Sequence, residues 1–166
     1  DNSSFNSKVV GTTMTNSGLE ESLQKKSIEL LRSDVGDKNV YKMMQSTGSI
    51  IGGEPSGHII NLEYLPTGDG LLTSLIIIKE LLTRQCSISD LTKGLTLVKQ
   101  HNMNIDIQNI DPEKLETLQA KASELIEDGR VIIRQSGTEP LIRVLIESDN
   151  KEIVNQINDL INEIRK

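Results

Sequence analysis

The chain has 166 residues, with 36% apolar and 25% charged side chains, a formal net charge of −6 and a pI of about 5.0. This composition is typical of a globular protein with one domain or two small ones, and the acidic balance argues against a nucleic-acid-binding surface. No apolar run reaches the roughly 18 residues that a membrane span needs, and the single cysteine, Cys86, excludes an internal disulfide. We therefore expect no nucleic-acid or membrane partner, and a reducing, cytoplasmic location.

The first half of the chain alternates β-prone and helical segments. Strands are predicted at residues 8–15, 28–31, 49–51 and 59–62. Helices are predicted between and after them: one capped by Asn16 or Ser17, one over residues 40–45 that Gly48 ends, and a long apolar one that Asp69 caps and that reaches Leu82. Alternating strands and helices indicate an α/β layer structure with a mixed sheet.

The pattern changes after residues 84–89, where the apolar density drops. A short helix is predicted at 90–93 and a long strand at 96–107. Asp111 and Pro112 begin a helix that Gly129 ends, strands follow at 131–133 and 142–146, and the last helix carries an apolar stripe from Ile153 to Ile164. We expect an α+β domain, with an antiparallel sheet and two helices on one face. The boundary is placed near residue 88, which gives domains 1–88 and 89–166.

Residues 134–143 (RQSGTEPLIR) have the make-up of an anion site. Arg134 and Arg143 flank a Ser136-Gly137-Thr138 turn between two β-prone runs. Glycine lets the backbone approach a ligand, the hydroxyls add donors, and arginines offer forked, charge-assisted hydrogen bonds that suit a phosphate group. On these residues alone, a plain β-hairpin with exposed arginines remains the alternative.

Residues 52–58 (GGEPSGH) form a second distinctive loop, rich in glycine and placed between two apolar strands. It exposes Glu54, Ser56 and His58, and a carboxylate beside a hydroxyl is suited to holding sugar hydroxyls. The alternative is an ordinary glycine-rich turn, with Glu54 solvated and His58 packed at the start of a strand.

Both loops resemble motifs of the α-D-phosphohexomutases, which move phosphate between C6 and C1 of a sugar. The pattern Arg-x-Ser-Gly-Thr-Glu-Pro-x-x-Arg resembles their phosphate-binding loop, and Gly-Glu-x-Ser-Gly-His resembles their sugar-binding loop. Residues 9–20, 35–38 and 67–70 are similar to the phosphoglucosamine mutase branch of this family, and the similarity runs from about residue 8 to the end.

The resemblance implies that the chain is most of the third domain and all of the fourth domain of a four-domain enzyme. By resemblance, that enzyme interconverts glucosamine 6-phosphate and glucosamine 1-phosphate through an enzyme phosphoserine and a 1,6-bisphosphate intermediate, and supplies amino-sugar precursors of a bacterial cell wall. The family loops assign the hexose to Glu54, Ser56 and His58. They assign the phosphate that is not transferred to Arg134, Ser136, Gly137, Thr138 and Arg143.

Two family motifs do not occur in the 166 residues: the Ser-His-Asn-Pro segment that carries the phosphoserine and the Asp-Gly-Asp loop that holds magnesium. We therefore expect no catalytic residue and no metal ligand here, and interpret Asp69 as a helix cap. Mg²⁺ would be bound by the preceding domains of the same polypeptide, with glucosamine 1,6-bisphosphate or glucose 1,6-bisphosphate as activator, and the chain alone should not turn over. The alternatives are phosphomannomutase or phosphoglucomutase specificity, or a non-catalytic phosphosugar-binding module.

Overall fold

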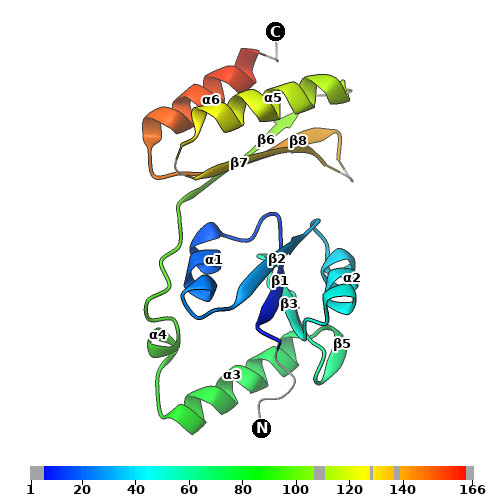
Figure 1. Ribbon diagram of the computed structural model, residues 1–166, viewed down its shortest axis with the longest axis vertical. Helices are drawn as coiled ribbons and strands as arrows, with labels where there is room; N and C mark the ends of the chain where they lie inside the picture. Colours follow the sequence, from blue (N-terminus) through cyan, green and yellow to red (C-terminus); the bar gives the residue numbers. More distant parts are fainter. Residues whose placement is uncertain (1–5, 107–110, 128, 137–138, 164–166) are drawn as a thin grey trace. The chain divides into compact units, whose positions relative to one another are not determined.

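The structure of the protein is a computed structural model, which describes residues 6–106, 111–127, 129–136 and 139–163 (Figure 1). The chain forms two compact units, Asp1–Leu97 and Val98–Lys166, which we call the first and the second unit. The division falls after Leu97, beyond the boundary that the sequence indicates near residue 88. In the described part of the chain, no helix has the length and apolar character needed to cross a membrane.

The first unit is built on a mixed five-stranded sheet with the strand order β2-β1-β3-β4-β5. The central strand β1 runs parallel to β2 and β3, whereas β3, β4 and β5 pair antiparallel. The mixed α/β sheet expected from the sequence is therefore confirmed. The strands are β1 (Lys8–Thr12), β2 (Glu29–Ser33), β3 (Ile51–Gly53), β4 (Ile59–Asn61) and β5 (Leu65–Gly68).

Local capping signals predict the helices of this unit well. The helices are α1 (Ser17–Gln24), α2 (Asp37–Thr47), α3 (Gly70–Arg84) and α4 (Ile88–Leu91). Asn16 caps α1, Asp69 caps α3 by accepting from Leu72 N over 2.8 Å, and Gly48 ends α2 with a left-handed φ of 70°. Helix α4 begins before the predicted residue 90, because Ser87 and Asp90 form a capping box. The hydrogen bonds that Asp90 accepts from the side chain and the backbone of Ser87 lower the pKa of Asp90.

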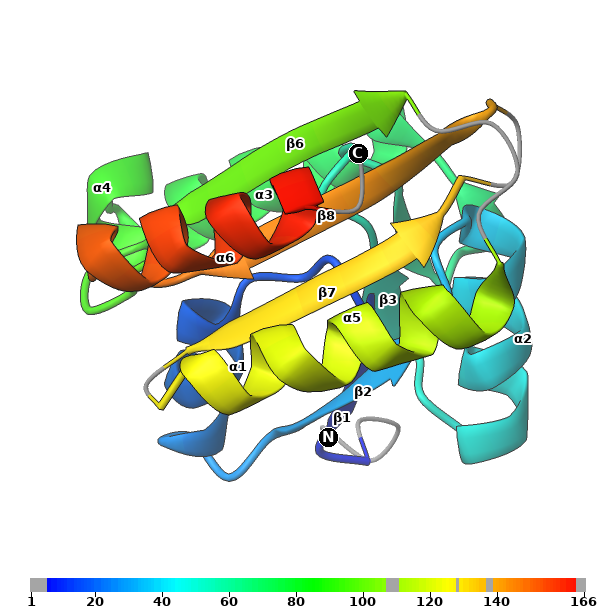
Figure 2. The same ribbon diagram turned by 90° about the horizontal axis from the view of Figure 1, so that it is seen from above.

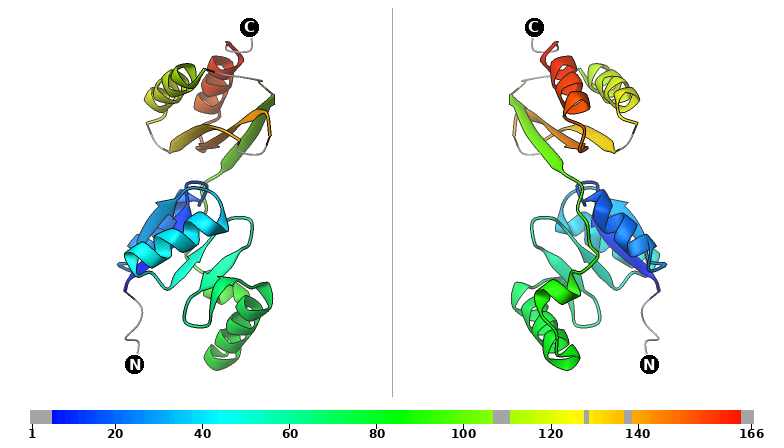
Figure 3. Two further views of the ribbon diagram at one scale, coloured as in Figure 1. Left: turned by 90° about the vertical axis from the view of Figure 1, so that its right-hand side faces the viewer. Right: turned by 90° about the vertical axis from the view of Figure 1, so that its left-hand side faces the viewer.

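The two faces of this sheet are covered unequally. Helix α2 lies along one face (Figure 3), and buries Val10, Val40, Met44 and Ile60 in a small core. On the other face, α1 and residues 95–97 leave a cavity of about 260 Å³. Its apolar lining includes Val9, Leu19, Leu30, Ile51, Leu95 and Leu97. Helix α3 is rich in Leu and Ile, yet it has no buried residue.

Residues 95–97 belong with the first unit because they lie against α1. The carbonyl oxygen of Thr96 occupies the place that a side chain at position 18 would need, so only glycine fits at Gly18. Because of this close approach, residues 95–97 belong to the first unit. The boundary between the units therefore lies after Leu97 and not near residue 88.

The second unit is a three-stranded antiparallel sheet with the order β6-β8-β7 and two helices on one face (Figure 2). This arrangement confirms the predicted α+β fold. Its elements are β6 (Gln100–Asp106), α5 (Pro112–Leu125), β7 (Arg130–Gln135), β8 (Leu141–Glu147) and α6 (Lys151–Glu163). Asp111 caps α5 and Pro112 begins it, as predicted. The core between sheet and helices includes Ile105, Leu118, Ala122, Val131, Ile133, Ile142, Val144, Ile146, Val154, Ile157 and Ile161.

Candidate functional site

The loop at residues 54–58 lies at the edge of the first unit's sheet where the parallel strands end. Strands β2, β1 and β3 are parallel neighbours, so their carboxyl ends meet at one edge, which is where open α/β sheets bind ligands. Residues 13–16 follow β1, residues 34–36 follow β2 and lead into α2, and residues 54–58 follow β3. Strand pairing thus brings three loops together that are far apart in the sequence.

The three residues predicted to bind sugar lie together in a compact, hydrogen-bonded turn. Glu54 N donates to the carbonyl oxygen of His58 and Gly57 N donates to that of Glu54, each over 3.0 Å. The Ser56 hydroxyl lies 3.0 Å from His58 Nδ1. Ser56 and His58 are exposed and Glu54 is half-buried, so a hydroxyl, an imidazole and a carboxylate are presented on one short loop.

A residue that the sequence argument did not assign to the site, Gly36, contacts the Glu54 carboxylate. Gly36 N donates to Glu54 Oε2 over 2.9 Å. The contact joins the start of α2 to the loop after β3, which lie on either side of β1 in the sheet. Gly36 precedes a predicted helix and can therefore be recognised in the sequence as the start of α2. Its contact with Glu54 depends on the strand order, which the sequence pattern does not contain.

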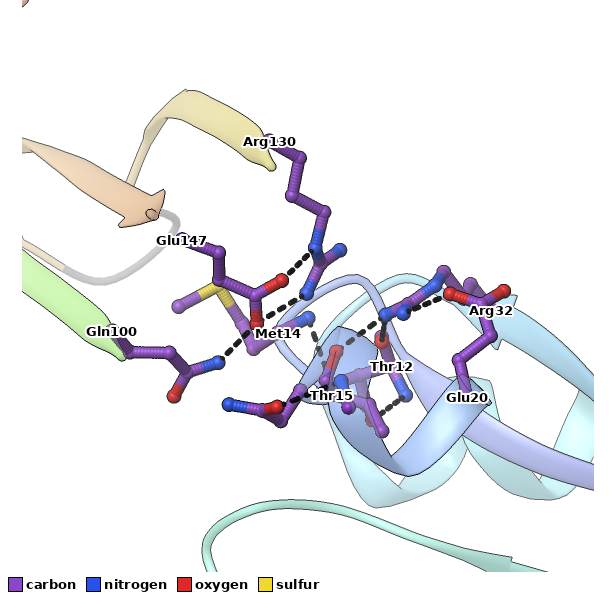
Figure 4. A network of polar contacts seen from close by, with 10 residues as sticks. Thr12, Met14, Thr15, Glu20, Arg32, Gln100, Arg130 and Glu147 are labelled. Carbon is purple, nitrogen blue, oxygen red and sulfur yellow. Dashed lines mark hydrogen bonds and ion pairs between the residues drawn. The ribbon is translucent and has the colours of Figure 1, made fainter. Parts of the chain in front are cut away.

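The loop after β1 is fixed by Arg32 of β2 (Figure 4). The Arg32 guanidinium donates to the carbonyl oxygen of Thr15 over 2.6 Å and to that of Thr12 over 3.2 Å, and pairs with Glu20 Oε2 over 2.6 Å. Thr12 N also donates to the Thr15 hydroxyl over 2.9 Å. These contacts satisfy the backbone of the turn and make it a rigid part of the carboxyl edge.

In the second unit, the two arginines of the predicted phosphate loop lie directly opposite each other. Arg134 of β7 pairs in register with Arg143 of β8. Residues on alternate sides of this hairpin face the helix core, as Ile133 and Val144 do, so the two arginines share the helix-free face of the sheet. On β6, Asn104 pairs with Arg143 and is exposed, which extends the row across all three strands.

The turn that joins these strands is only partly described. Ser136 is 8% exposed, and its amide donates to the carbonyl oxygen of Leu141 over 2.8 Å, which closes the hairpin. Gly137 and Thr138, which the sequence assigns to the phosphate, lie outside the described residues.

The Arg143 guanidinium already holds a carboxylate. Its Nη2 donates to Glu139 Oε2 over 2.6 Å in a pair that is open to solvent, with 38% and 53% of the two side chains exposed. Its Nε is buried, and no described residue accepts a hydrogen bond from it. Arg143 therefore combines a solvent-open pair through Nη2 with a buried Nε that has no described acceptor.

A second charged row lies in register across the same three strands, where Gln100 and Arg130 flank Glu147 (Figure 4). Glu147 is fully buried, and its carboxylate accepts from Arg130 Nε over 2.5 Å and from Gln100 Nε2 over 2.6 Å. Gln100 and Arg130, on the two neighbouring strands, donate to the buried carboxylate and compensate its charge. The row therefore links β6, β8 and β7 and has a structural role.

A metal site does not arise from the described residues, which contain no group of three or more His, Cys, Asp or Glu side chains able to hold an ion. Asp69, the residue most open to misinterpretation as a ligand, caps α3. Among the described residues, no such cluster is therefore present for a magnesium ion.

Comparison with known proteins identifies the family. The model of the phosphoglucomutase/phosphomannomutase alpha/beta/alpha domain III matches residues 1–97, and that of the C-terminal domain of the same proteins matches residues 103–164. The chain belongs to the phosphoglucomutase/phosphomannomutase family. The first match ends at Leu97, where the first compact unit also ends.

Curated relatives within this family are phosphoglucosamine mutases. The chain is 44% identical to the phosphoglucosamine mutase of Psychrobacter arcticus over 163 residues, covering 95% of this chain and 36% of the relative. It is 40% identical to that of Pseudoalteromonas translucida over 151 residues, covering 88% of this chain and 34% of the relative. The chain thus spans about a third of the length of these relatives.

Solved structures share the fold of this family member. N-acetylphosphoglucosamine mutase from Aspergillus fumigatus superposes with a TM-score of 0.77 at 15% identity, over 95% of this chain and 38% of that one. Other structures of that enzyme contain N-acetylglucosamine 6-phosphate with magnesium (TM-score 0.73, 15% identity) or glucose 1,6-bisphosphate (TM-score 0.76, 16% identity). The match to the structure with N-acetylglucosamine 6-phosphate covers 96% of this chain and 41% of that one. The match to the structure with glucose 1,6-bisphosphate covers 95% of this chain and 38% of that one.

Proposed function

We propose that this chain supplies the sugar-binding and distal-phosphate-binding parts of a phosphoglucosamine mutase, which interconverts glucosamine 6-phosphate and glucosamine 1-phosphate. The names of relatives at 40% and 44% identity support the amino-sugar specificity. The structural observation that carries the proposal is the cross-strand pair of arginines, Arg134 and Arg143, beside the Ser136 turn. Like charges directly opposite each other destabilise a sheet. A bound dianion would neutralise this repulsion and form charge-assisted hydrogen bonds with both arginines, and both effects favour binding.

In the proposed complex, Arg134, Arg143 and the Ser136-Gly137-Thr138 turn bind the phosphate that is not transferred. Each charge-assisted hydrogen bond contributes about 1.5–3 kcal/mol, so several of them orient the sugar firmly. Glu54, Ser56 and His58 bind ring hydroxyls, so that binding energy aligns the reacting hydroxyl. Transfer itself belongs to an enzyme phosphoserine, which gives its phosphoryl group to the free sugar hydroxyl and regains one from the other end of the 1,6-bisphosphate.

The phosphoserine and the magnesium ion belong, on this proposal, to preceding domains of a longer polypeptide. The described residues offer no metal site, and the Ser-His-Asn-Pro segment does not occur in the sequence. We propose a cytoplasmic location for this enzyme. The chain by itself should bind phosphosugar without turning it over.

The second candidate function is a sister specificity, as a phosphoglucomutase or phosphomannomutase. It is favoured by the family models, whose descriptions name those activities. A non-catalytic phosphosugar-binding module, the other alternative, would show binding of the same ligands but no mutase activity in any longer form of the protein.

The deciding experiment measures mutase activity of the full-length protein with glucosamine, glucose and mannose 6-phosphates. Phosphoglucosamine mutase predicts the highest kcat/KM for glucosamine 6-phosphate. Arg134→Ala and Arg143→Ala should each remove most phosphosugar affinity while circular dichroism stays unchanged, and Glu54→Gln should mainly reduce discrimination between glucosamine and glucose phosphates. Unchanged kinetics in both arginine variants would remove the phosphate assignment.

Titration of the 166-residue chain separates the two half-sites. Amide shifts at Ser136 with inorganic phosphate alone would indicate that the second unit binds phosphate independently. Shifts at Glu54 to Gly57 that need glucosamine 6-phosphate would support the sugar assignment, and glucosamine without phosphate is the control.

A further inference from the structure

The start of helix α2 holds one of the two oxygens of the Glu54 carboxylate. Gly36 N donates to Oε2 over 2.9 Å, and in the described part of the chain no other group donates to this carboxylate. An ionised carboxylate accepts through both oxygens, so Oε1 remains available to a ligand hydroxyl. The amide also lies at the positive end of the α2 dipole, which favours a negative charge there.

The backbone of Gly36 adopts a conformation that side chains rarely permit. Its φ is 119° and its ψ is 132°, and no side chain caps the helix at this position. The turn is braced around it: Asn39 Nδ2 donates to the carbonyl oxygen of Val35 over 2.9 Å, and Asn39 N and Val40 N both donate to that of Gly36. The direction of the Gly36 N–H is therefore fixed before any ligand arrives.

We propose that Gly36 is a positioning residue for sugar recognition, which fixes the Glu54 side chain through Oε2 and presents Oε1 to a hexose hydroxyl. This inference rests on the proposed function, because it takes Glu54 as a sugar-binding residue. It adds that the geometry of that residue depends on the start of α2, a segment outside the sugar loop.

The first test is Gly36→Ala in the full-length enzyme. A methyl group at this position has space, since its nearest neighbour would be Asn39 Nδ2 at 3.6 Å, so the substitution acts through the backbone conformation and the direction of the amide. Loss of a hydrogen bond to a charged group corresponds to a rise in KM for glucosamine 6-phosphate of about 10- to 100-fold, with a smaller change in kcat.

Gly48→Ala is the matched control. Gly48 ends the same helix, also with a positive φ (70°), but it has no contact with Glu54. It should lower stability as Gly36→Ala does and leave KM unchanged. An equal rise in KM in both variants would mean that Gly36 acts only through the stability of α2, and would overturn the proposal.

A double-mutant cycle tests whether Gly36 acts through Glu54. In a Glu54→Ala background, Gly36→Ala should change KM less than about twofold, because the group that it positions is gone. If Gly36→Ala raised KM in this background by the same factor as in the wild type, the positioning role would be excluded.

Spectra of the 166-residue chain labelled with ¹⁵N-glycine separate this proposal from the proposed function. Glu54→Ala should move the Gly36 amide proton upfield and leave that of Gly48 in place; an unmoved Gly36 signal would overturn the contact. If the signal moved as expected and the wild-type enzyme showed no preference for a hexosamine phosphate, the proposed function would fail while the contact stood. The role of the contact in amino-sugar recognition would then fall with that function.

Discussion

The two units of this chain bury their apolar surface to different extents. In the second unit, sheet and helices enclose one continuous core, to which α6 contributes Val154, Ile157 and Ile161. Among the described residues of the first unit, the buried core lies on the face under α2, while the opposite face borders an apolar cavity of about 260 Å³. Helix α3 exposes Leu71 and Leu82 by 73% and 74%. Since burial of apolar surface is the main stabilising contribution, the second unit should be the more stable of the two.

The largest expected effect concerns the charge buried in the second unit. Arg130→Met removes the cation that pairs with the Glu147 carboxylate, whose side chain is fully buried. Breaking a buried pair on one side costs about 3–5 kcal/mol, and we expect this loss in the free energy of unfolding, measured by urea titration with circular dichroism.

The control for this prediction is the exposed pair of the first unit. Arg84→Met breaks a pair with Glu80 whose side chains are 64% and 42% exposed, and it should change stability by less than about 1 kcal/mol. Removing the buried charge as well, with Glu147→Leu in the Arg130→Met background, should restore part of the loss. Equal effects of Arg130→Met and Arg84→Met would contradict the difference between the units.

The next effect tests whether the two cores are independent. Met44 of the first unit and Ile157 of the second are both fully buried, and replacing either by Ala should cost about 2–5 kcal/mol. Both tyrosines, Tyr41 and Tyr64, lie in the first unit, and the chain has no tryptophan. Tyrosine fluorescence should therefore report Met44→Ala and remain unaffected by Ile157→Ala, which circular dichroism detects. A single transition shifted by both variants would show that the cores unfold together.

Local signals in the sequence were enough to predict most elements. Asp111 before Pro112 marked the start of α5, and the stripe from Ile153 onward marked α6, because caps and helical periodicity depend only on near neighbours. Strand β5 was missed, since Pro66 and Gly68 are poor strand formers and the segment exists by pairing with β4.

Non-local features could not be predicted in this way. The contact between Gly36 and Glu54 requires the strand order β2-β1-β3, which no local pattern contains. The exposure of α3 is also unexpected from its sequence, because a helix that is apolar on most sides is usually buried. The residues of the two loops were found from their chemistry and from the resemblance, and their binding roles stay predictions.

A smaller effect is expected at the anion site of the second unit. Glu139→Gln removes the carboxylate that Arg143 holds, and frees the guanidinium for phosphate. Since exposed pairs contribute about 0.2–1 kcal/mol, the affinity of the chain for inorganic phosphate should rise by about 1.5- to 5-fold at low salt, measured by NMR titration. Glu80→Gln, at the exposed pair in α3, is the control and should not change it. Weaker phosphate binding by Glu139→Gln would show that Glu139 supports the site instead.

The smallest effect is expected in α3. Leu82→Ser changes a side chain that is 74% exposed, so the free energy of unfolding of the 166-residue chain should change by no more than about 0.5 kcal/mol. Ile161→Ser in α6, where the side chain is 3% exposed, is the matched variant and should cost at least as much as an Ile→Ala change, about 2–5 kcal/mol. Comparable losses of stability in both variants would mean that α3 buries its apolar side chains in solution. The first unit would then bury its apolar surface to the same extent as the second. A neutral Leu82→Ser that also reduces self-association, seen by light scattering, would instead identify the α3 surface as apolar area that contributes nothing to the stability of its own unit.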